Sequence, residues 1–306
     1  MVTIEIDEQN IDKMVHRSCS PLFATDQFGV RGHNPKSTNA TVTYVKFSNR
    51  IYALTCHHVL EALHAEARRS SHRIVPSVHT ADRKIWQFGS YTAEGKYRWT
   101  FTSCRDFASE VMLEAAETAK GLGHSDPLEQ FRKRNSNFPD IAIADLTAHW
   151  ESFRSDRALE PFDLDKWNED DWSITQPVWL AYGFPNNHKF EKGNMVSAPM
   201  PRISISLATP PPSEDKPHFT LFHAFEKDHI WGFSGMSGGP ALVAHASEEK
   251  FGFVGLVFEG VPAHADEAGT SESYVGQSDI LIRGYYITPN IFSQWLAQLK
   301  HGVEFA

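Results

Sequence analysis

Short runs of apolar and β-branched residues recur along the chain, with clusters of Gly, Pro, Asn and Ser between them. Runs of this kind, bounded by turn residues, are typical of β-strands. Many short strands at such spacing predict an all-β barrel or sandwich. The predicted strands are residues 41–47, 51–54, 85–88, 97–102, 141–146, 178–182, 202–207, 220–225, 252–258 and 280–287.

Two segments follow a helical pattern instead. Residues 107–120 are rich in helix formers, with apolar positions at helical spacing, and the glycines just after them are typical of a helix end. Residues 291–299 follow a Pro-Asn pair, and their apolar side chains lie three or four positions apart, on one face. We interpret that face as a core contact.

Composition limits the classes of partner. The 306 residues are 41% apolar and 22% charged, which is ordinary for a globular protein and suits one two-lobed domain or two small ones. A net charge of -9 without a basic block argues against a nucleic-acid surface. No apolar stretch is long enough to cross a bilayer. We therefore expect neither nucleic acid nor membrane as a partner.

The N-terminal segment and the cysteines predict a cytoplasmic location. Residues 1–20 contain early acids and lack the apolar core of a secretory signal. Cys19, Cys56 and Cys104 form no CxxC pair and no disulfide framework, which suits a reducing compartment.

The strongest chemical signal is Gly-Met-Ser-Gly-Gly-Pro at residues 235–240. A serine nucleophile needs a base beside it and N–H groups aimed at the developing oxyanion. Flanking glycines let the chain turn sharply enough to supply both. The alternative interpretation is a glycine-rich turn with an incidental serine. The motif also matches the nucleophile elbow of α/β-hydrolases, but in that fold the acid and the histidine follow the serine and Pro240 would fall in a helix. We exclude that fold.

Two more segments complete the pattern: Leu-Thr-Cys-His-His-Val at 54–59 and Asp-Ile-Ala-Ile-Ala-Asp-Leu at 140–146. Each alone is more often structural than catalytic. Together, in the order His, Asp, Ser, they resemble the motifs of chymotrypsin/trypsin-like serine proteases, here of an intracellular bacterial type. The resemblance implies that Ser237 is the nucleophile, His58 the base and Asp140 the acid that orients it. His57 then stands where the family commonly has a small or amide residue.

The resemblance also implies the architecture. We expect two antiparallel Greek-key β-barrels, a C-terminal helix and an active site between the barrels. The first lobe would span residues 1–165 and the second lobe residues 166–306. Because 82 positions separate His58 from Asp140, we expect a partly helical insertion in the first barrel at about residues 106–137.

The surroundings of the triad follow from the same resemblance. The N–H groups of Gly235 and Ser237 would form the oxyanion hole. By the family's spacing, the specificity pocket has Trp231 at its base, which predicts cleavage after apolar or small residues rather than Lys or Arg. The residues implied in substrate binding are Trp231, Phe258, Glu259, Gly260 and Gly284.

Two departures from the family pattern bear on control. Met236 replaces the aspartate that pairs with a new N-terminus in secreted members, so activation by that route is not expected. Phe258 replaces a serine that commonly supports the catalytic aspartate, so Asp140 must have another partner. Neither flank of the triad leaves room for a regulatory domain of ~50 residues. We therefore expect restraint by a partner protein, by self-association or by a poorly formed oxyanion loop at residues 233–236 that something else orders, with the insertion as the docking surface.

The predicted function is a serine endopeptidase acting on protein or peptide substrates. It needs no cofactor and no metal, since the 16 histidines are scattered and show no zinc spacing. The alternative is a catalytically inactive trypsin-like fold that serves as a protein-binding module.

Overall fold

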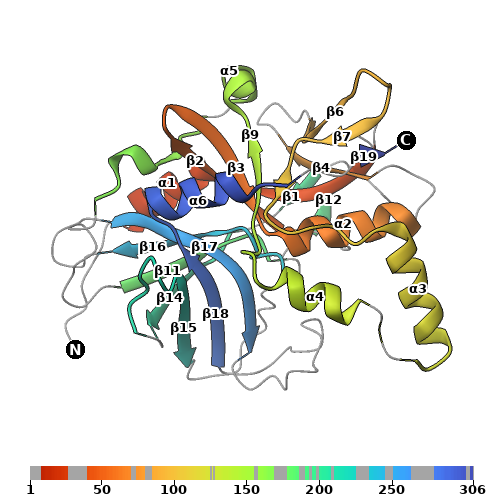
Figure 1. Cartoon of the computed structure of the whole chain (residues 1–306). Helices are drawn as coiled ribbons and strands as arrows, with labels where there is room; N and C mark the ends of the chain where they lie inside the picture. The colour runs from red at the N-terminus through yellow and green to blue at the C-terminus, as the bar shows by residue number, and fades with distance from the viewer. Residues whose placement is uncertain are drawn as a thin grey trace.

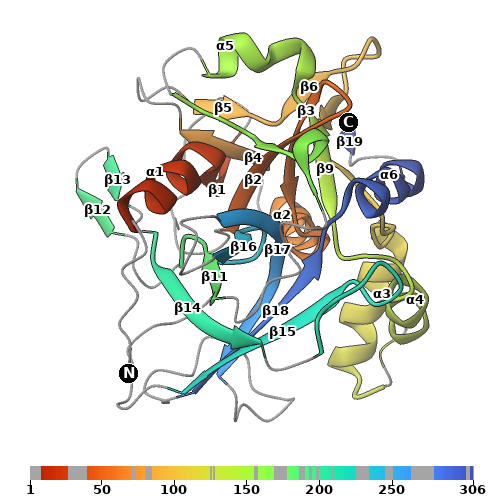
Figure 2. The ribbon, with the colours of Figure 1, turned by 90° about the vertical axis from the view of Figure 1, so that its left-hand side faces the viewer.

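The structure is a computed structural model, and Figures 1 and 2 show it from two sides. The residues that it describes are 8–26, 40–69, 74–79, 85–124, 126, 128–154, 158–168, 178–185, 190–192, 195–197, 200–207, 210–224, 234–244, 251–262, 279–300 and 304–305. Two β-sheets, one from each half of the chain, form the body of the molecule (Figure 1).

The first sheet is a curled antiparallel half-barrel. Its strand order is β5-β4-β1-β2-β3-β9-β8, with β10 parallel to β2. Its strands are β1 (Cys19–Asp26), β2 (Ala40–Phe47), β3 (Arg50–Thr55), β4 (Ile74–His79), β5 (Ile85–Gln87), β8 (Thr102–Ser103), β9 (Ala142–Asp145) and β10 (Phe162–Asp163). A small separate sheet joins β6 (Gly89–Tyr91), β7 (Tyr97–Trp99) and β19 (Glu304–Phe305).

The second sheet closes on itself as an antiparallel barrel in the order β11-β14-β15-β18-β17-β16. Its strands are β11 (Val178–Tyr182), β14 (Arg202–Leu207), β15 (His218–Ala224), β16 (Pro240–Ala244), β17 (Phe251–Pro262) and β18 (Asp279–Tyr286). A short hairpin of β12 (Phe190–Lys192) and β13 (Met195–Ser197) lies outside the barrel.

Helices surround the sheets. They are α1 (Glu8–Ser18), α2 (His57–Arg69), α3 (Glu110–Gly121), α4 (Glu129–Asn135), α5 (Trp150–Arg154) and α6 (Pro289–Gln298), with 3-10 turns η1 (Thr147–His149) and η2 (Leu164–Lys166). Helices α3 and α4 lie in the predicted insertion and share a small core of their own around Leu128 and Phe131. No helix among the described residues combines the length and the apolar character that a membrane span requires.

The two-barrel fold predicted from the sequence is confirmed, and it is consistent with the trypsin-like fold. Every predicted strand overlaps an observed one, and both predicted helices are present. Helix α3 begins at Glu110 rather than at residue 107, because the Ser109 side chain accepts the N–H of Met112 and caps the helix there. Helices α1, α2, α4 and α5 and several strands were not predicted.

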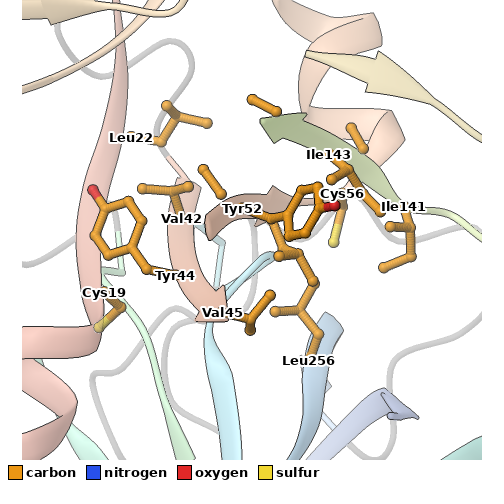
Figure 3. Close-up of a cluster of buried hydrophobic side chains, with 14 of the residues drawn as sticks. Cys19, Leu22, Val42, Tyr44, Val45, Tyr52, Cys56, Ile141, Ile143 and Leu256 are labelled. Atoms are coloured by element: carbon orange, nitrogen blue, oxygen red, sulfur yellow. The ribbon is translucent and has the colours of Figure 1, made fainter. Parts of the chain in front are cut away.

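Strand β2 joins the two lobes, because its two faces are both buried and contact different lobes. Val42 and Tyr44 point into the first-lobe core, while Thr41 and Thr43 point toward the loop before β16. Leu256 of β17 packs in the same cluster as these first-lobe side chains (Figure 3). The first-lobe core therefore extends across the boundary to side chains of the second lobe, while the interior of the second barrel forms a separate cluster.

We predict that Leu256→Ala lowers the free energy of unfolding by about 2–5 kcal/mol, because it leaves a cavity in this shared core. Urea denaturation measures the change. The control is Val111→Ala on α3, where the residue is 75% exposed, and its effect should stay within about 0.5 kcal/mol. A loss for Leu256→Ala as small as that of the control would contradict the shared core.

Candidate active site

Sheet pairing brings two of the predicted site residues together. His58 lies in the first turn of α2, directly after β3. Strand β3 pairs with β9, with Thr55 opposite Ala142. Asp140 precedes β9 by two positions, so it arrives beside His58 although 82 positions separate them in the chain.

Asp140 is held on several sides. Its Oδ2 lies 2.6 Å from His58 Nδ1, and its Oδ1 accepts the backbone N–H of His58 at 2.9 Å. Its own N–H donates to the hydroxyl of Tyr285, on β18 of the second barrel, at 2.8 Å. Arg105 Nη1 is 3.8 Å from Oδ1. The Asp140 side chain is only 10% exposed, so these contacts replace water around a charged group.

Ser237 completes a chain of polar contacts. Its Oγ lies 3.0 Å from His58 Nε2 and 3.1 Å from the carbonyl oxygen of Phe258. The structure thus brings His58, Asp140 and Ser237 into one line of hydrogen-bond distances, with the imidazole between carboxylate and hydroxyl. The His58 side chain remains 43% exposed, which leaves the site open to a ligand.

The loop that carries Ser237 is tied to strand β2. The N–H of Thr41 donates to the Ser237 carbonyl at 2.9 Å, and the Thr41 hydroxyl donates to the Gly235 carbonyl at 3.0 Å. The Thr43 hydroxyl donates to the Gly238 carbonyl at 2.7 Å. Three hydrogen bonds from strand β2 to carbonyl groups of the loop therefore fix the position of the loop.

Glycine is required at two positions of the same loop. Gly235 has a φ of 97° and Gly238 a φ of 88°, in the left-handed region that other residues rarely adopt. A Cβ on Gly238 would also lie 2.0 Å from the Thr41 carbonyl oxygen. The sharp turn around Ser237 and its close approach to β2 both depend on this residue type.

Burial and charge act in opposite directions on the two ionisable groups. Burial alone would raise the pKa of Asp140, but the hydrogen bond and charge of His58 and the charge of Arg105 lower it to about 2. Burial alone would lower the pKa of His58, but the hydrogen bond and charge of Asp140 outweigh it and raise that pKa above its ordinary value. The pair favours an ionised carboxylate and a more basic imidazole.

The neighbouring His57 faces away from Ser237. Its Nδ1 lies 2.7 Å from Ser103 Oγ, and its ring packs on Phe107 with 4.8 Å between centroids. Burial lowers the pKa of His57 to about 4, so the ring is neutral at ordinary pH. Of the two adjacent histidines, His58 is the one that reaches the serine.

The residues predicted to bind substrate are spread over β17 and β18. Glu259 pairs with Arg283 at 2.8 Å, and Gly260 lies opposite Ile282 on β18. The side of Gly284 where a Cβ would stand is occupied by the Phe219 ring, at 2.1 Å. Trp231, the predicted base of the pocket, lies outside the described residues, so the composition of the pocket stays a prediction.

Metal and thiol chemistry find little support in the described part of the chain. No group of three His, Cys, Asp or Glu side chains there is arranged to hold a metal ion. Cys19, Cys56 and Cys104 are buried and form no disulfide within the described part of the chain. Burial raises the pKa of Cys56 and raises that of Cys104 to about 12, so both thiols remain protonated.

Two partners of Asp140 were not predicted from the sequence. Arg105 stands 35 positions before Asp140, at the start of the insertion, and no motif marks it. Tyr285 lies in the predicted strand 280–287, but no sequence motif indicates that its hydroxyl contacts the backbone of Asp140. The one available signal was the phenylalanine at position 258, which required some other support for the carboxylate.

Comparisons with known proteins find similarity to solved structures at low sequence identity. No protein-family model and no curated protein matches the chain. Among solved structures, a thermostable serine protease AL20 from an extremophilic microorganism is 11% identical, with a TM-score of 0.42, over 91% of this chain and 95% of that chain. The protease Anisep from Arthrobacter nicotinovorans is 12% identical, with a TM-score of 0.42, over 92% and 95% of the two chains. Deg5 is 13% identical, with a TM-score of 0.37, over 83% and 86%. Because these TM-scores are low, the assignment of the site depends on the geometry of this chain alone.

Proposed function

We propose that this chain is a serine endopeptidase that hydrolyses peptide bonds of protein or peptide substrates. The observation that carries the proposal is the line of contacts from Asp140 Oδ2 through His58 to Ser237 Oγ, with distances of 2.6 and 3.0 Å. A nucleophile, a base and a group that orients the base are the three parts that acyl transfer through serine requires.

In the proposed reaction, Ser237 Oγ attacks the carbonyl carbon of the scissile bond while its proton passes to His58 Nε2. Asp140 holds the proton on Nδ1 and stabilises the imidazolium. The C–N bond then breaks, and the proton on Nε2 passes to the leaving amine. Water hydrolyses the acyl-enzyme by the same route and restores the Ser237 hydroxyl.

The proposed oxyanion hole consists of the N–H groups of Gly235 and Ser237. The hydrogen bonds from Thr41 and Thr43 support this role, because they hold the carbonyls of the loop against β2 before any substrate arrives. Donors that are already oriented stabilise the developing charge without a cost of reorganisation during the reaction.

We predict that Ser237→Ala, His58→Ala and Asp140→Asn each reduce peptide hydrolysis by about 10³-fold or more, because they remove the nucleophile, the base and the group that orients the base, respectively. Ser237→Ala combined with His58→Ala should cost little more than either change alone, since the residues act as a unit. Hydrolysis of a casein substrate and labelling by a fluorophosphonate probe measure the effects.

Two matched variants control this experiment. Ser213→Ala, in an exposed turn, should label like the unchanged protein, and His57→Gln should retain activity because His57 faces Ser103. Failure of the unchanged protein to label or to hydrolyse would favour the alternative, a trypsin-like binding module without activity. Loss of activity in His57→Gln but not in His58→Ala would exchange the roles of the two histidines.

We predict that kcat/KM falls on acidification with a midpoint above pH 6.5. The base must be neutral to accept the serine proton, and the hydrogen bond and charge of Asp140 raise the pKa of His58 above its ordinary value of 6.5. Below that midpoint the rate should fall about tenfold per pH unit. His57→Gln should leave the midpoint unchanged, because His57 is already neutral there. A midpoint below pH 6.5 would contradict the coupling of His58 to Asp140.

We further predict cleavage after apolar or small residues. This expectation derives from Trp231 at the predicted base of the pocket. The ion pair between Glu259 and Arg283 supports it, because the Glu259 carboxylate is then already paired and does not attract a basic side chain of the substrate. A peptide library profiled by mass spectrometry measures the preference. A profile dominated by Lys or Arg would contradict it, and Glu259→Gln would then show whether that carboxylate is responsible.

A further inference from the structure

Arg105 lies at the junction between the insertion and the site. It stands two positions after β8, and its side chain is only 21% exposed. Its Nε donates to the carbonyl of Phe138 at 2.9 Å, and its Nη1 lies 3.8 Å from Asp140 Oδ1. Its own N–H donates to Ser103 Oγ at 3.0 Å. One guanidinium therefore contacts the end of the insertion and the carboxylate beside it.

The base of the insertion is closed around this arginine. The side-chain amide of Asn135 both accepts the N–H of Asp106, at 3.1 Å, and donates to its carbonyl, at 2.7 Å. Lys300 Nζ reaches Asp106 Oδ2 at 2.9 Å and stands 4.0 Å from the centre of the Phe138 ring. The two ends of the insertion are thus joined next to Arg105, which fixes the peptide to which its Nε donates.

Among the described residues, the positive charges that act on Asp140 are those of His58 and Arg105. At 3.8 Å, Arg105 Nη1 is beyond hydrogen-bond distance from Oδ1, so it acts on the carboxylate through its charge. That charge acts at a carboxylate which is only 10% exposed, where screening by solvent is weak. Phe258, which stands where a supporting serine was expected, presents its ring to Tyr285 instead.

We propose that Arg105 is a positioning residue, which acts through its charge on the carboxylate of Asp140, keeps that carboxylate aligned with His58 and thereby links the triad to the base of the insertion. The inference rests on the proposed function of Asp140 as the group that orients the base. It assigns Arg105 no contact with substrate.

The sign of its effect can be stated from the groups around the pair. The positive charge of Arg105 lowers the pKa of Asp140 and also that of His58. Its removal should therefore raise both. The other titratable groups that act on His58 and Asp140 or lie beside them are His57 and Glu61 on α2, Asp106, Glu259 on β17 and Tyr285 on β18. The charge of Arg105 also acts to lower the pKa of Cys56, His57, Glu61 and Tyr285, so the titration that is measured must be assigned to His58 itself.

Two substitutions separate charge from hydrogen bonding. Arg105→Gln removes the charge but keeps an amide that can donate to the Phe138 carbonyl. Arg105→Lys keeps the charge but has no Nε donor. The primary measurement is the midpoint of the His58 imidazole titration by NMR, made in a Ser237→Ala background and assigned by comparison with His58→Gln. The second measurement is kcat/KM against pH in the active protein.

We expect Arg105→Gln to raise the His58 midpoint by about half a pH unit to one unit, as the loss of a close charge does. Its kcat at neutral pH should fall about tenfold, as for a modest misplacement of a catalytic group. Arg105→Lys should keep the midpoint within about 0.3 units, since the charge remains. Arg134→Gln, on α4 of the same insertion, is the matched control and should change neither quantity.

The outcomes discriminate clearly. Equal midpoints in the unchanged, Gln and Lys proteins would overturn the inference, as would equal shifts in Gln and Lys, because a purely structural role has no dependence on charge. The titration requires no activity. If the midpoint shifts only in Arg105→Gln and the protein hydrolyses no substrate, the electrostatic effect of Arg105 on His58 and Asp140 is supported. The proposed peptidase function is then contradicted.

Discussion

The contact of strand β2 with the loop of Ser237 is the constraint on which the site depends. The nucleophile is carried by the second barrel and the base by the first, so any sliding of one lobe on the other would separate them. Thr41 and Thr43 prevent that sliding by binding three carbonyls of the loop. Because Gly238 has no Cβ, its backbone can approach β2 closely enough for these contacts. The triad distances follow from that approach.

Much of the fold could be predicted because strands with alternating or continuous apolar residues leave a local signal. Strands β11 and β14 begin and end at the predicted residues. Helix α2 is not among the elements predicted from the sequence, because its first residues belong to the histidine motif. Val59, Leu60 and Leu63 nevertheless form a buried helical face. Strand β16 is short and begins at Pro240, so it has no run of alternating apolar and polar residues that would predict a strand.

The same distinction applies to the site: short local motifs predict some of its residues, while other contacts join residues that are far apart in the sequence. The roles predicted for His58, Asp140 and Ser237 came from short motifs in a particular order, and the structure brings these three side chains to hydrogen-bond distances. The contacts that hold Asp140 come from Arg105 and Tyr285, which are 35 positions before it and 145 after it. No local pattern encodes such pairs, because they depend on how the insertion closes and on how β18 meets the first lobe.

Helix α6 bears on how the protein is made. It follows the second barrel in sequence, yet it lies beside the first sheet (Figure 2), where Phe292 packs edge-on against Phe47 and Tyr52. A nascent chain that has left the ribosome only as far as β18 therefore has a first lobe with an uncovered apolar surface. Final packing of both lobes must wait for residues 289–298 to emerge. Translation itself thus delays the assembly of the site until helix α6 has been synthesised.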